Sequence, residues 1–257
     1  MIVTKNNNIR QGFPECRGST ISYPCYAEIK LDGELNWFNN GKLYNKSGKT
    51  REKCPITDAL DTKHTLIGEL YYGRGQLGQL YPLLSHQDSD DLNYCVFDVL
   101  TTTTPPGLTY EERREILLNE VKESAHVSIV PTWYLEEKEQ LDELKEEVWN
   151  EGFEGLVVKS PNSMYQTGPC KWVKIKKKDR NDYQVVYIDP SLERVEVTVP
   201  VPSVGAHDYR RVGVKVVNRY KSRLKLHDSI TVEHQGQLSA GGLRHPCYIP
   251  KEKGGTL

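Results

Sequence analysis

Charged side chains stand inside those runs of the sequence that otherwise carry the alternating apolar pattern of β-strands. They are, in chain order, Glu28, Lys30, Asp32, Glu69, Asp98, Glu154, Lys174 and Lys176. A buried charge is costly unless it is paired or coordinated. These residues therefore constrain the fold, because the strands that carry them have to bring acids and amines together at a shared site.

The first of these runs is Glu28-Ile29-Lys30-Leu31-Asp32-Gly33. Strand alternation predicts that Lys30 and Asp32 share a face, and Gly33 lets another backbone or a ligand come close. A lysine amine is a good nucleophile only when it is uncharged, a form that neighbouring cations or burial favour. On its own the motif is weak evidence, because a surface Lys–Asp pair beside a turn explains it equally well.

The order of the expected elements predicts an α+β fold. Strands are expected at 26–30, 42–44, 65–72, 93–100, 155–159 and 172–176, with residues 34–38 as the hairpin partner of the first strand. A capping box that starts at Thr109 predicts a helix from Tyr110 to Ser124. The spacing of Leu141, Leu144 and Val148 predicts a second helix over 136–150.

A change of pattern follows the basic run at residues 176–180. Short strands are expected at 184–189, 193–199, 212–219 and 229–235, which is typical of a small β-barrel. A chain of 257 residues is long enough for two modest domains. We therefore expect one domain at residues 1–180 and a second at residues 181–257.

Composition limits the class of protein. The six cysteines are scattered and form no C-x-x-C pair, which favours reduced thiols over a disulfide framework or a zinc site. No run approaches the roughly 20 apolar residues that span a bilayer, and no apolar leader begins the chain. These features predict an intracellular protein, in the cytoplasm or nucleoid or in a host cell if the protein is viral, whose metal, if any, is bound by oxygen.

The net charge of −1 hides strong segregation. Residues 111–154 carry a net charge of −9, whereas residues 171–180 carry +5 and residues 207–225 carry +6. Two basic blocks in a nearly neutral chain predict a localised surface for a polyanion. Runs of Lys and Arg also occur on ordinary solvated surfaces, so either block alone is weaker evidence.

Carboxylates and lysines that converge on a sheet predict a site for an anion together with a hard cation. Mg²⁺ in such a site takes one or two carboxylates plus the phosphates of a substrate. Lys174 and Lys176 would hold the phosphate and, by like-charge repulsion, favour the uncharged form of Lys30. The amine of Lys30 could then attack phosphorus.

Five motifs in a fixed order carry a resemblance to a known family. They are K-x-D-G at Lys30–Gly33, G-E-L-Y at Gly68–Tyr71, V-F-D-V-L at Val96–Leu100, E-G-L-V-V-K at Glu154–Lys159 and W-V-K-I-K at Trp172–Lys176. This series resembles the covalent nucleotidyltransferases, and most closely the ATP-dependent DNA ligases in a minimal two-domain form. The segments D-S-I-T-V-E-H-Q at 228–235 and G-G-L-R-H-P at 241–246 are similar to the end of a DNA-ligase OB domain.

The resemblance implies a fold and an activity. The fold would be a nucleotidyltransferase domain of ATP-grasp-like antiparallel sheets with helices, followed by an all-β OB-fold domain. The activity would be the sealing of 5′-phosphate/3′-hydroxyl nicks, as in DNA repair and replication, through a lysyl–AMP intermediate and an adenylated 5′-phosphate. The expected cofactors are ATP and Mg²⁺ (or Mn²⁺), because the 29 residues before Lys30 are too few for the nicotinamide-recognition domain of NAD-dependent ligases. The expected partner is nicked double-stranded DNA, bound by a monomer without a membrane.

The resemblance also assigns roles to residues. Catalytic roles fall to Lys30, which would attack the α-phosphate of ATP, to Asp32 in the sealing step, and to Lys174 and Lys176 on the α-phosphate. Cofactor-binding roles fall to Glu28 at the adenine edge, Lys46 at sugar and phosphate, Glu69 at the ribose, Phe97 stacked on the base, and Lys159. The metal would be held by Glu69 and Glu154.

Some positions depart from the family pattern and leave alternatives open. Leu35 stands where K-x-D-G-x-R has its arginine, and spacing does not show whether Arg51 or Arg74 substitutes. Lys251 and Lys253 are the only residues left for the C-terminal basic motif that orients pyrophosphate.

The same lysine chemistry also serves RNA ligases and RNA-capping guanylyltransferases. The L-R-H-P tail favours DNA as the substrate, and Leu35 weakens that preference. A degenerate ligase-like module that only binds nucleic acid is the alternative of another class.

Overall fold

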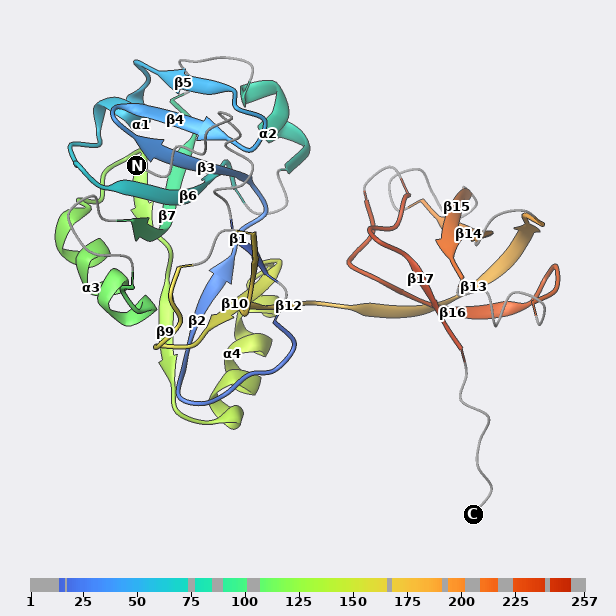
Figure 1. Cartoon of the computed structure of the whole chain (residues 1–257). Coiled ribbons are helices and arrows are strands. Elements are labelled where there is room, and N and C mark those ends of the chain that lie inside the picture. The colour runs from blue at the N-terminus through green and yellow to red at the C-terminus, as the bar shows by residue number, and fades with distance from the viewer. Residues whose placement is uncertain are drawn as a thin grey trace. The chain divides into compact units, whose positions relative to one another are not determined.

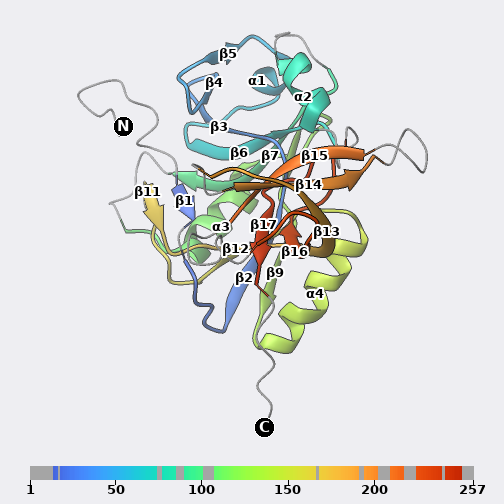
Figure 2. The same cartoon turned by 90° about the vertical axis from the view of Figure 1, so that its right-hand side faces the viewer.

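The computed structural model describes residues 14–16, 18–73, 77–84, 90–100, 107–165, 168–190, 194–201, 209–216, 224–238 and 241–250. The chain divides into two compact units, Met1–Ile175 and Lys176–Leu257 (Figures 1 and 2). Among the described residues, no helix has both the length and the apolar character that crossing a bilayer requires. Each unit is built around its own core.

The first unit contains a six-stranded sheet. Its strands are ordered β5 (Thr50–Glu52), β4 (Lys42–Asn45), β3 (Glu34–Asn39), β6 (Thr65–Tyr71), β7 (Asn93–Leu100) and β8 (Val127–Ile129). All pairs are antiparallel except β7–β8. Three helices add Ile56, Leu80 and Leu117 to its apolar core; they are α1 (Pro55–Asp58), α2 (Leu77–Leu84) and α3 (Tyr110–Glu120).

A second, four-stranded sheet in the same unit carries the early lysine. Its order is β12 (Val173–Lys176), β10 (Gly155–Lys159), β2 (Cys25–Lys30) and β9 (Thr132–Leu135). Helix α4 (Lys138–Asn150) packs Leu141, Leu144 and Val148 into the core of this sheet, as their spacing predicts. A short parallel pair, β1 (Pro14–Cys16) with β11 (Gly168–Cys170), completes the unit.

The second unit is a closed barrel of five strands. They are β13 (Asp179–Ile188), β14 (Arg194–Pro200), β15 (Tyr209–Lys215), β16 (Ser229–His234) and β17 (Cys247–Ile249), in the order β13-β14-β15-β17-β16. Alternate residues of β14, Val195, Val197 and Val199, fill the interior. A five-stranded Greek-key barrel of this kind is an OB-fold, which confirms the predicted α+β class with an all-β domain after the mixed one.

The predicted hairpin between the Lys30 strand and residues 34–38 is wrong. Strand β3 pairs with β4 and β6, whereas β2 pairs with β9 and β10. The chain thus leaves one sheet at Lys30 and enters the other at Glu34. Asp32 lies in this connection and not in a strand, so the alternation that placed Lys30 and Asp32 on one face does not apply.

The helix ends also differ from the sequence prediction. Helix α3 ends at Glu120 because Val121 takes an extended conformation. Helix α4 begins at Lys138 because Glu137 and Gln140 form its capping box. Helix α2 and the short strand β17 were not predicted, since neither is long enough to show a period.

Candidate active site

A cavity of about 280 Å³ lies between the two larger sheets of the first unit. Its charged lining residues are Glu28, Lys30, Lys46, Glu69, Lys159 and Lys174. Four lysines and two acids give this cavity the character of an anion site. Its lining also includes Phe97 and Trp172, which supply aromatic surface.

Lys30 and Glu154 form an ion pair at the edge of this cavity. Lys30 ends β2, and its register partner on the antiparallel strand β10 is Gly155. The residue before Gly155 therefore reaches the lysine, and Lys30 Nζ binds Glu154 Oε2. The two side chains are 17% and 11% exposed, so water screens the pair only weakly. The sequence predicted Glu154 as a metal ligand and did not predict this contact.

Glu69 lies beside the same pair. Its Oε1 accepts a hydrogen bond of 3.2 Å from the backbone N–H of Gly33. Burial raises the pKa of Glu69 to about 7, with Glu154 and Asp32 acting in the same direction and Lys30 against it. Glu69 is therefore within electrostatic reach of the lysine and of both other acids.

Glu28 is held in a buried network. Its Oε2 lies 2.7 Å from Lys159 Nζ, and its Oε1 accepts a hydrogen bond from the Tyr110 hydroxyl. Burial raises the pKa of Tyr110, and the Glu28 carboxylate raises it further, so this hydroxyl stays a donor. Glu28 and Lys159 are 2% and 1% exposed. Removing either partner of a buried ion pair leaves an uncompensated buried charge, so Glu28 and Lys159 stabilise each other.

Aromatic rings surround the Lys159 ammonium. Its Nζ lies 4.0 Å from the centre of the Trp172 ring, 4.6 Å from that of Tyr110 and 4.9 Å from that of Phe97. The rings of Phe97 and Trp172 meet edge to face with 6.4 Å between centroids. These cation–π contacts fix two rings at the cavity wall.

The structure places the other predicted residues as follows. Lys46 and Lys174 line the cavity, from the turn after β4 and from β12. Asp32 is half-buried in the β2–β3 connection and is not part of the cavity lining. Lys176 begins the second unit, where its Nζ lies 3.2 Å from Gln235 Oε1. Its role at a phosphate therefore stays a prediction.

The position of the missing arginine is occupied by Leu35, which lines the cavity. Arg51 does not replace it, because the Arg51 guanidinium is buried on β5 and donates to the carbonyl of Leu84. Arg74, Lys251 and Lys253 lie outside the described residues.

Sequence reasoning gave no role to three residues of the site. Trp172 stands in the W-V-K-I-K motif, and Tyr110 follows the helix cap at Thr109, so both had a local signal. Cys16 also lines the cavity, and its position in the sequence gave no sign of this.

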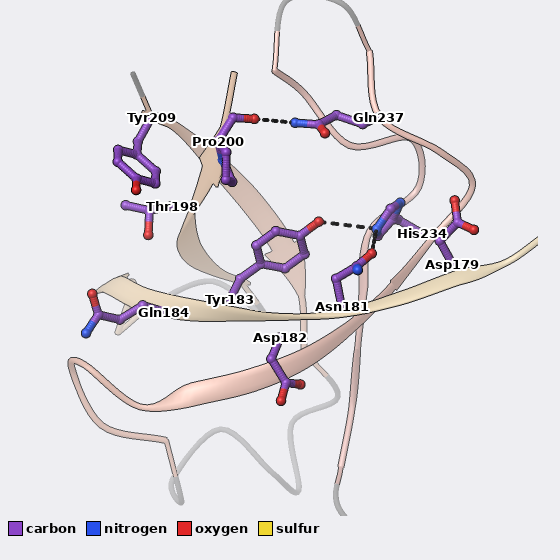
Figure 3. Close-up of a pocket in the computed structure, with 10 residues that line it drawn as sticks. All are labelled: Asp179, Asn181, Asp182, Tyr183, Gln184, Thr198, Pro200, Tyr209, His234 and Gln237. Atoms are coloured by element: carbon purple, nitrogen blue, oxygen red, sulfur yellow. Dashed lines mark hydrogen bonds between the residues drawn. The ribbon is translucent and has the colours of Figure 1, made fainter. Parts of the chain in front are cut away.

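A larger cavity of about 800 Å³ lies in the barrel (Figure 3). His234 Nε2 there lies 2.9 Å from Asn181 Oδ1 and 3.3 Å from the Tyr183 hydroxyl. Among the described residues, the lining holds two acids, Asp179 and Asp182, and neither Lys nor Arg. Of the two cavities, the smaller one therefore has the lining charge that suits an anion.

Glu69 on the cavity wall and Glu154, which is paired with Lys30 at the edge of the cavity, fit a magnesium ion shared with phosphate. The Glu154 carboxylate contributes to the raised pKa of Glu69, an effect that a cation between them would relieve. Among the described residues, no three His, Cys, Asp or Glu side chains cluster as a ready metal site. Two carboxylates completed by substrate oxygens are the usual arrangement for Mg²⁺.

Comparisons with known proteins give a consistent result. The family model "ATP dependent DNA ligase domain" matches residues 59–176. A probable DNA ligase of Aquifex aeolicus is 40% identical over 84 residues, which is 31% of this chain and 14% of that protein. The chain spans 13% to 15% of the length of the curated relatives it matches.

Solved structures resemble the chain over most of its length. One, described as a Lig E DNA ligase that binds DNA with a minimal scaffold, has a TM-score of 0.75 at 18% identity. The match covers 93% of this chain and 98% of that one. The ATP-dependent DNA ligase of bacteriophage T7, in complex with ATP, has a TM-score of 0.54 at 17% identity over 94% of this chain and 99% of that one. At these identities the likeness establishes the fold.

Proposed function

Because residues 59–176 of this chain match the family model of the ATP-dependent DNA ligase domain, we propose that the protein is an ATP-dependent DNA ligase that seals nicks in duplex DNA. The observation that carries the proposal is the position of Lys30 on the wall of a cavity that also holds Lys46, Lys159 and Lys174. An intracellular location, where ATP and DNA are both present, goes with this proposal. We assign nucleotide transfer to residues 1–180 and the OB-fold to residues 181–257, acting as a monomer.

Lys30 is the nucleophile of the first step. Its amine attacks the α-phosphorus of ATP, a P–N bond forms, and the bond from phosphorus to the pyrophosphate oxygen breaks. The Lys30 ammonium first has to lose a proton, and Glu154 is the carboxylate in contact with it. Lys174 holds the α-phosphate, where negative charge increases in the transition state. Lys176, the last residue of the strand β12 that carries Lys174, acts on the same phosphate.

The remaining cavity residues bind the nucleotide. Phe97, on the cavity wall beside Trp172, offers its ring to the base. Glu28 reads the adenine edge from a position fixed by Lys159 and Tyr110. Lys46 contacts sugar and phosphate. Glu69 and Glu154 would hold Mg²⁺, which supplies charge neutralisation at the phosphates when bound.

Two further transfers complete the reaction. An oxygen of the 5′-phosphate at the nick attacks the lysyl–AMP phosphorus and releases the Lys30 amine. The 3′-hydroxyl then attacks the 5′-phosphate, a phosphodiester forms, and AMP leaves. Asp32, two residues after Lys30 and within electrostatic reach of Glu69, acts in this sealing step. Basic residues of both blocks hold the DNA backbone by its phosphates.

Mass spectrometry of the intact protein after incubation with ATP and Mg²⁺ tests the proposal. We expect an adduct of one AMP unit in the wild type and none in Lys30→Ala. Lys138→Ala, an exposed lysine of α4, serves as the matched control and should form the adduct normally. An adduct formed with GTP in place of ATP would indicate a capping enzyme. Sealing of nicked RNA in preference to nicked DNA would indicate an RNA ligase. Binding of nicked DNA without any adduct would instead identify a non-catalytic module.

A further inference from the structure

Two cysteines face each other beside the cavity. Cys16 on β1 and Cys170 on β11 are direct partners in a parallel register, and the Cys170 thiol donates a hydrogen bond to the Cys16 sulfur. Neighbouring strands lie about 4.8 Å apart, and a disulfide accepts Cα separations of about 4.4 to 6.8 Å. The two residues are free thiols here. A bond between them therefore requires little movement of the backbone.

The surroundings of Cys16 favour its thiolate. The hydrogen bond from Cys170 and the cations of three neighbouring strands lower the pKa of Cys16 to about 6, although burial acts in the opposite direction. Those cations are Lys174 on β12, Lys159 on β10 and Lys30 on β2, and the cavity also holds the carboxylates of Glu28 and Glu69. The pKa of Cys170 is raised, so Cys170 stays a thiol while Cys16 ionises.

We propose that Cys16 is a modification site on the wall of this cavity, reactive toward low-molecular-weight disulfides, with Cys170 as its resolving thiol. The Cys16 thiolate attacks one sulfur of the reagent, a mixed disulfide forms, and one thiolate leaves. The Cys170 thiol gives up its proton and attacks the Cys16 sulfur. The Cys16–Cys170 bond forms as the second thiolate leaves. The protein loses two electrons and the reagent gains them.

Cys16 combines a position on the cavity wall with a facing thiol and three nearby lysines, and the other described cysteines lack this combination. Burial raises the pKa of Cys25 and of Cys95 to about 11 each, and Cys54 is 4% exposed. Cys247 on β17 is half-buried, like Cys16, and lies in the barrel. The register partner of Cys247 on β15 is Lys215 and not a cysteine, so Cys247 is the matched control for a half-buried cysteine without a facing thiol.

The expected selectivity follows from two opposing effects. At pH 6 about half of a thiol with a pKa of 6 is ionised, against roughly 0.3% of an ordinary thiol. The lower basicity reduces the nucleophilicity of the thiolate by about tenfold over this interval. The net expectation is that Cys16 reacts roughly tenfold faster than Cys247 at pH 6, and that this advantage is lost by pH 8, where an ordinary thiol is itself about a quarter ionised.

Titration of the reduced full-length protein with 2,2′-dipyridyl disulfide at pH 6 tests this proposal. The release of 2-thiopyridone should show a fast phase of two equivalents in the wild type, and peptide mass spectrometry should find the Cys16–Cys170 bond. Cys170→Ser should release one fast equivalent and retain a mixed disulfide on Cys16. Cys16→Ser should lose the fast phase, and Cys247→Ser should keep it.

A fast phase that survives in Cys16→Ser would overturn the proposal, and so would a mixed disulfide that persists on Cys16 in the wild type. A separate experiment adds an ATP analogue with a methylene bridge between the α- and β-phosphates, which should slow the fast phase several-fold. The identity of the cavity as a nucleotide site rests on the proposed function. If the cysteines react as expected but the analogue has no effect, the proposed cavity assignment fails and the inference about Cys16 stands.

Discussion

Burial opposes the ionisation of Glu69 in the cavity. Its pKa is about 7, against 4.5 for an ordinary glutamate. Between these values the folded protein binds the proton that the unfolded chain releases, so the contribution of Glu69 to stability is greatest below pH 4.5 and is lost as the pH rises through 7. The expected loss from this residue is on the order of 3 kcal/mol.

Replacing Glu69 should remove this dependence on pH. We expect Glu69→Gln to flatten the decrease in the free energy of unfolding between pH 4.5 and 7.5, measured by urea denaturation in EDTA. Glu143→Gln, at an exposed position of α4, should keep the wild-type slope. A wild-type slope in Glu69→Gln would show that another group causes the pH dependence.

At the residue level, the sequence predicted types of residue better than partners. Lys30 and Glu154 stand out because each adjoins an apolar strand core, yet 124 positions separate them. Their contact depends on β10 lying beside β2, which no local pattern reveals. The network of Glu28, Lys159 and Tyr110 has the same cause, since it joins three elements that are distant in the sequence.

The connection between β2 and β3 carries the chain from one sheet to the other, and Gly33 allows it to pass close to β6. A Cβ at this position would lie 2.2 Å from the carbonyl oxygen of Leu70 and 2.6 Å from Glu69 Cγ. The first of these contacts is with backbone, which can move away only by breaking the β3–β6 register.

Alanine at position 33 should therefore destabilise the protein. We expect Gly33→Ala to lower the free energy of unfolding by about 2 kcal/mol or more, in the range of overpacked sites. Adduct formation should decrease as well, because Lys30 and Glu69 flank the connection. Gly213→Ala on β15, where a Cβ would meet open space, is the matched control and should be nearly neutral in thermal denaturation. Equal effects of the two substitutions would refute the packing argument.

At the element level, periodicity identified the strands but not their neighbours. Residues 34–38 have the pattern of a strand, and proximity in sequence favoured pairing with the Lys30 strand. Strand β3 instead pairs with β6, and the backbone N–H of Gly33, just before β3, donates a hydrogen bond to Glu69 on β6. Helix α4 was predicted well because Leu141, Leu144 and Val148 face one core.

Charge separates the two units of the whole molecule. Residues 176–257 carry 15 Lys and Arg against 9 Asp and Glu, a net charge of +6, whereas residues 1–175 carry a net charge of −7. The cavity that we propose for the nucleotide lies in the acidic unit, where local lysines give it the character of an anion site. The barrel is positive as a whole, which suits a surface that meets many phosphates at once.

This separation predicts where DNA affinity originates. Lys177 is exposed in the basic block between β12 and β13, and Lys138 is exposed on the acidic helix α4. We expect Lys177→Ala to weaken binding of non-ligatable nicked DNA several-fold in fluorescence anisotropy. It should also reduce the slope of log K against log salt by about 1, which is the contribution of one phosphate contact. Lys138→Ala removes the same charge and should change neither quantity. If both lysines mattered equally, net charge alone would govern the affinity, and the proposed role of the basic block at residues 171–180 would fail.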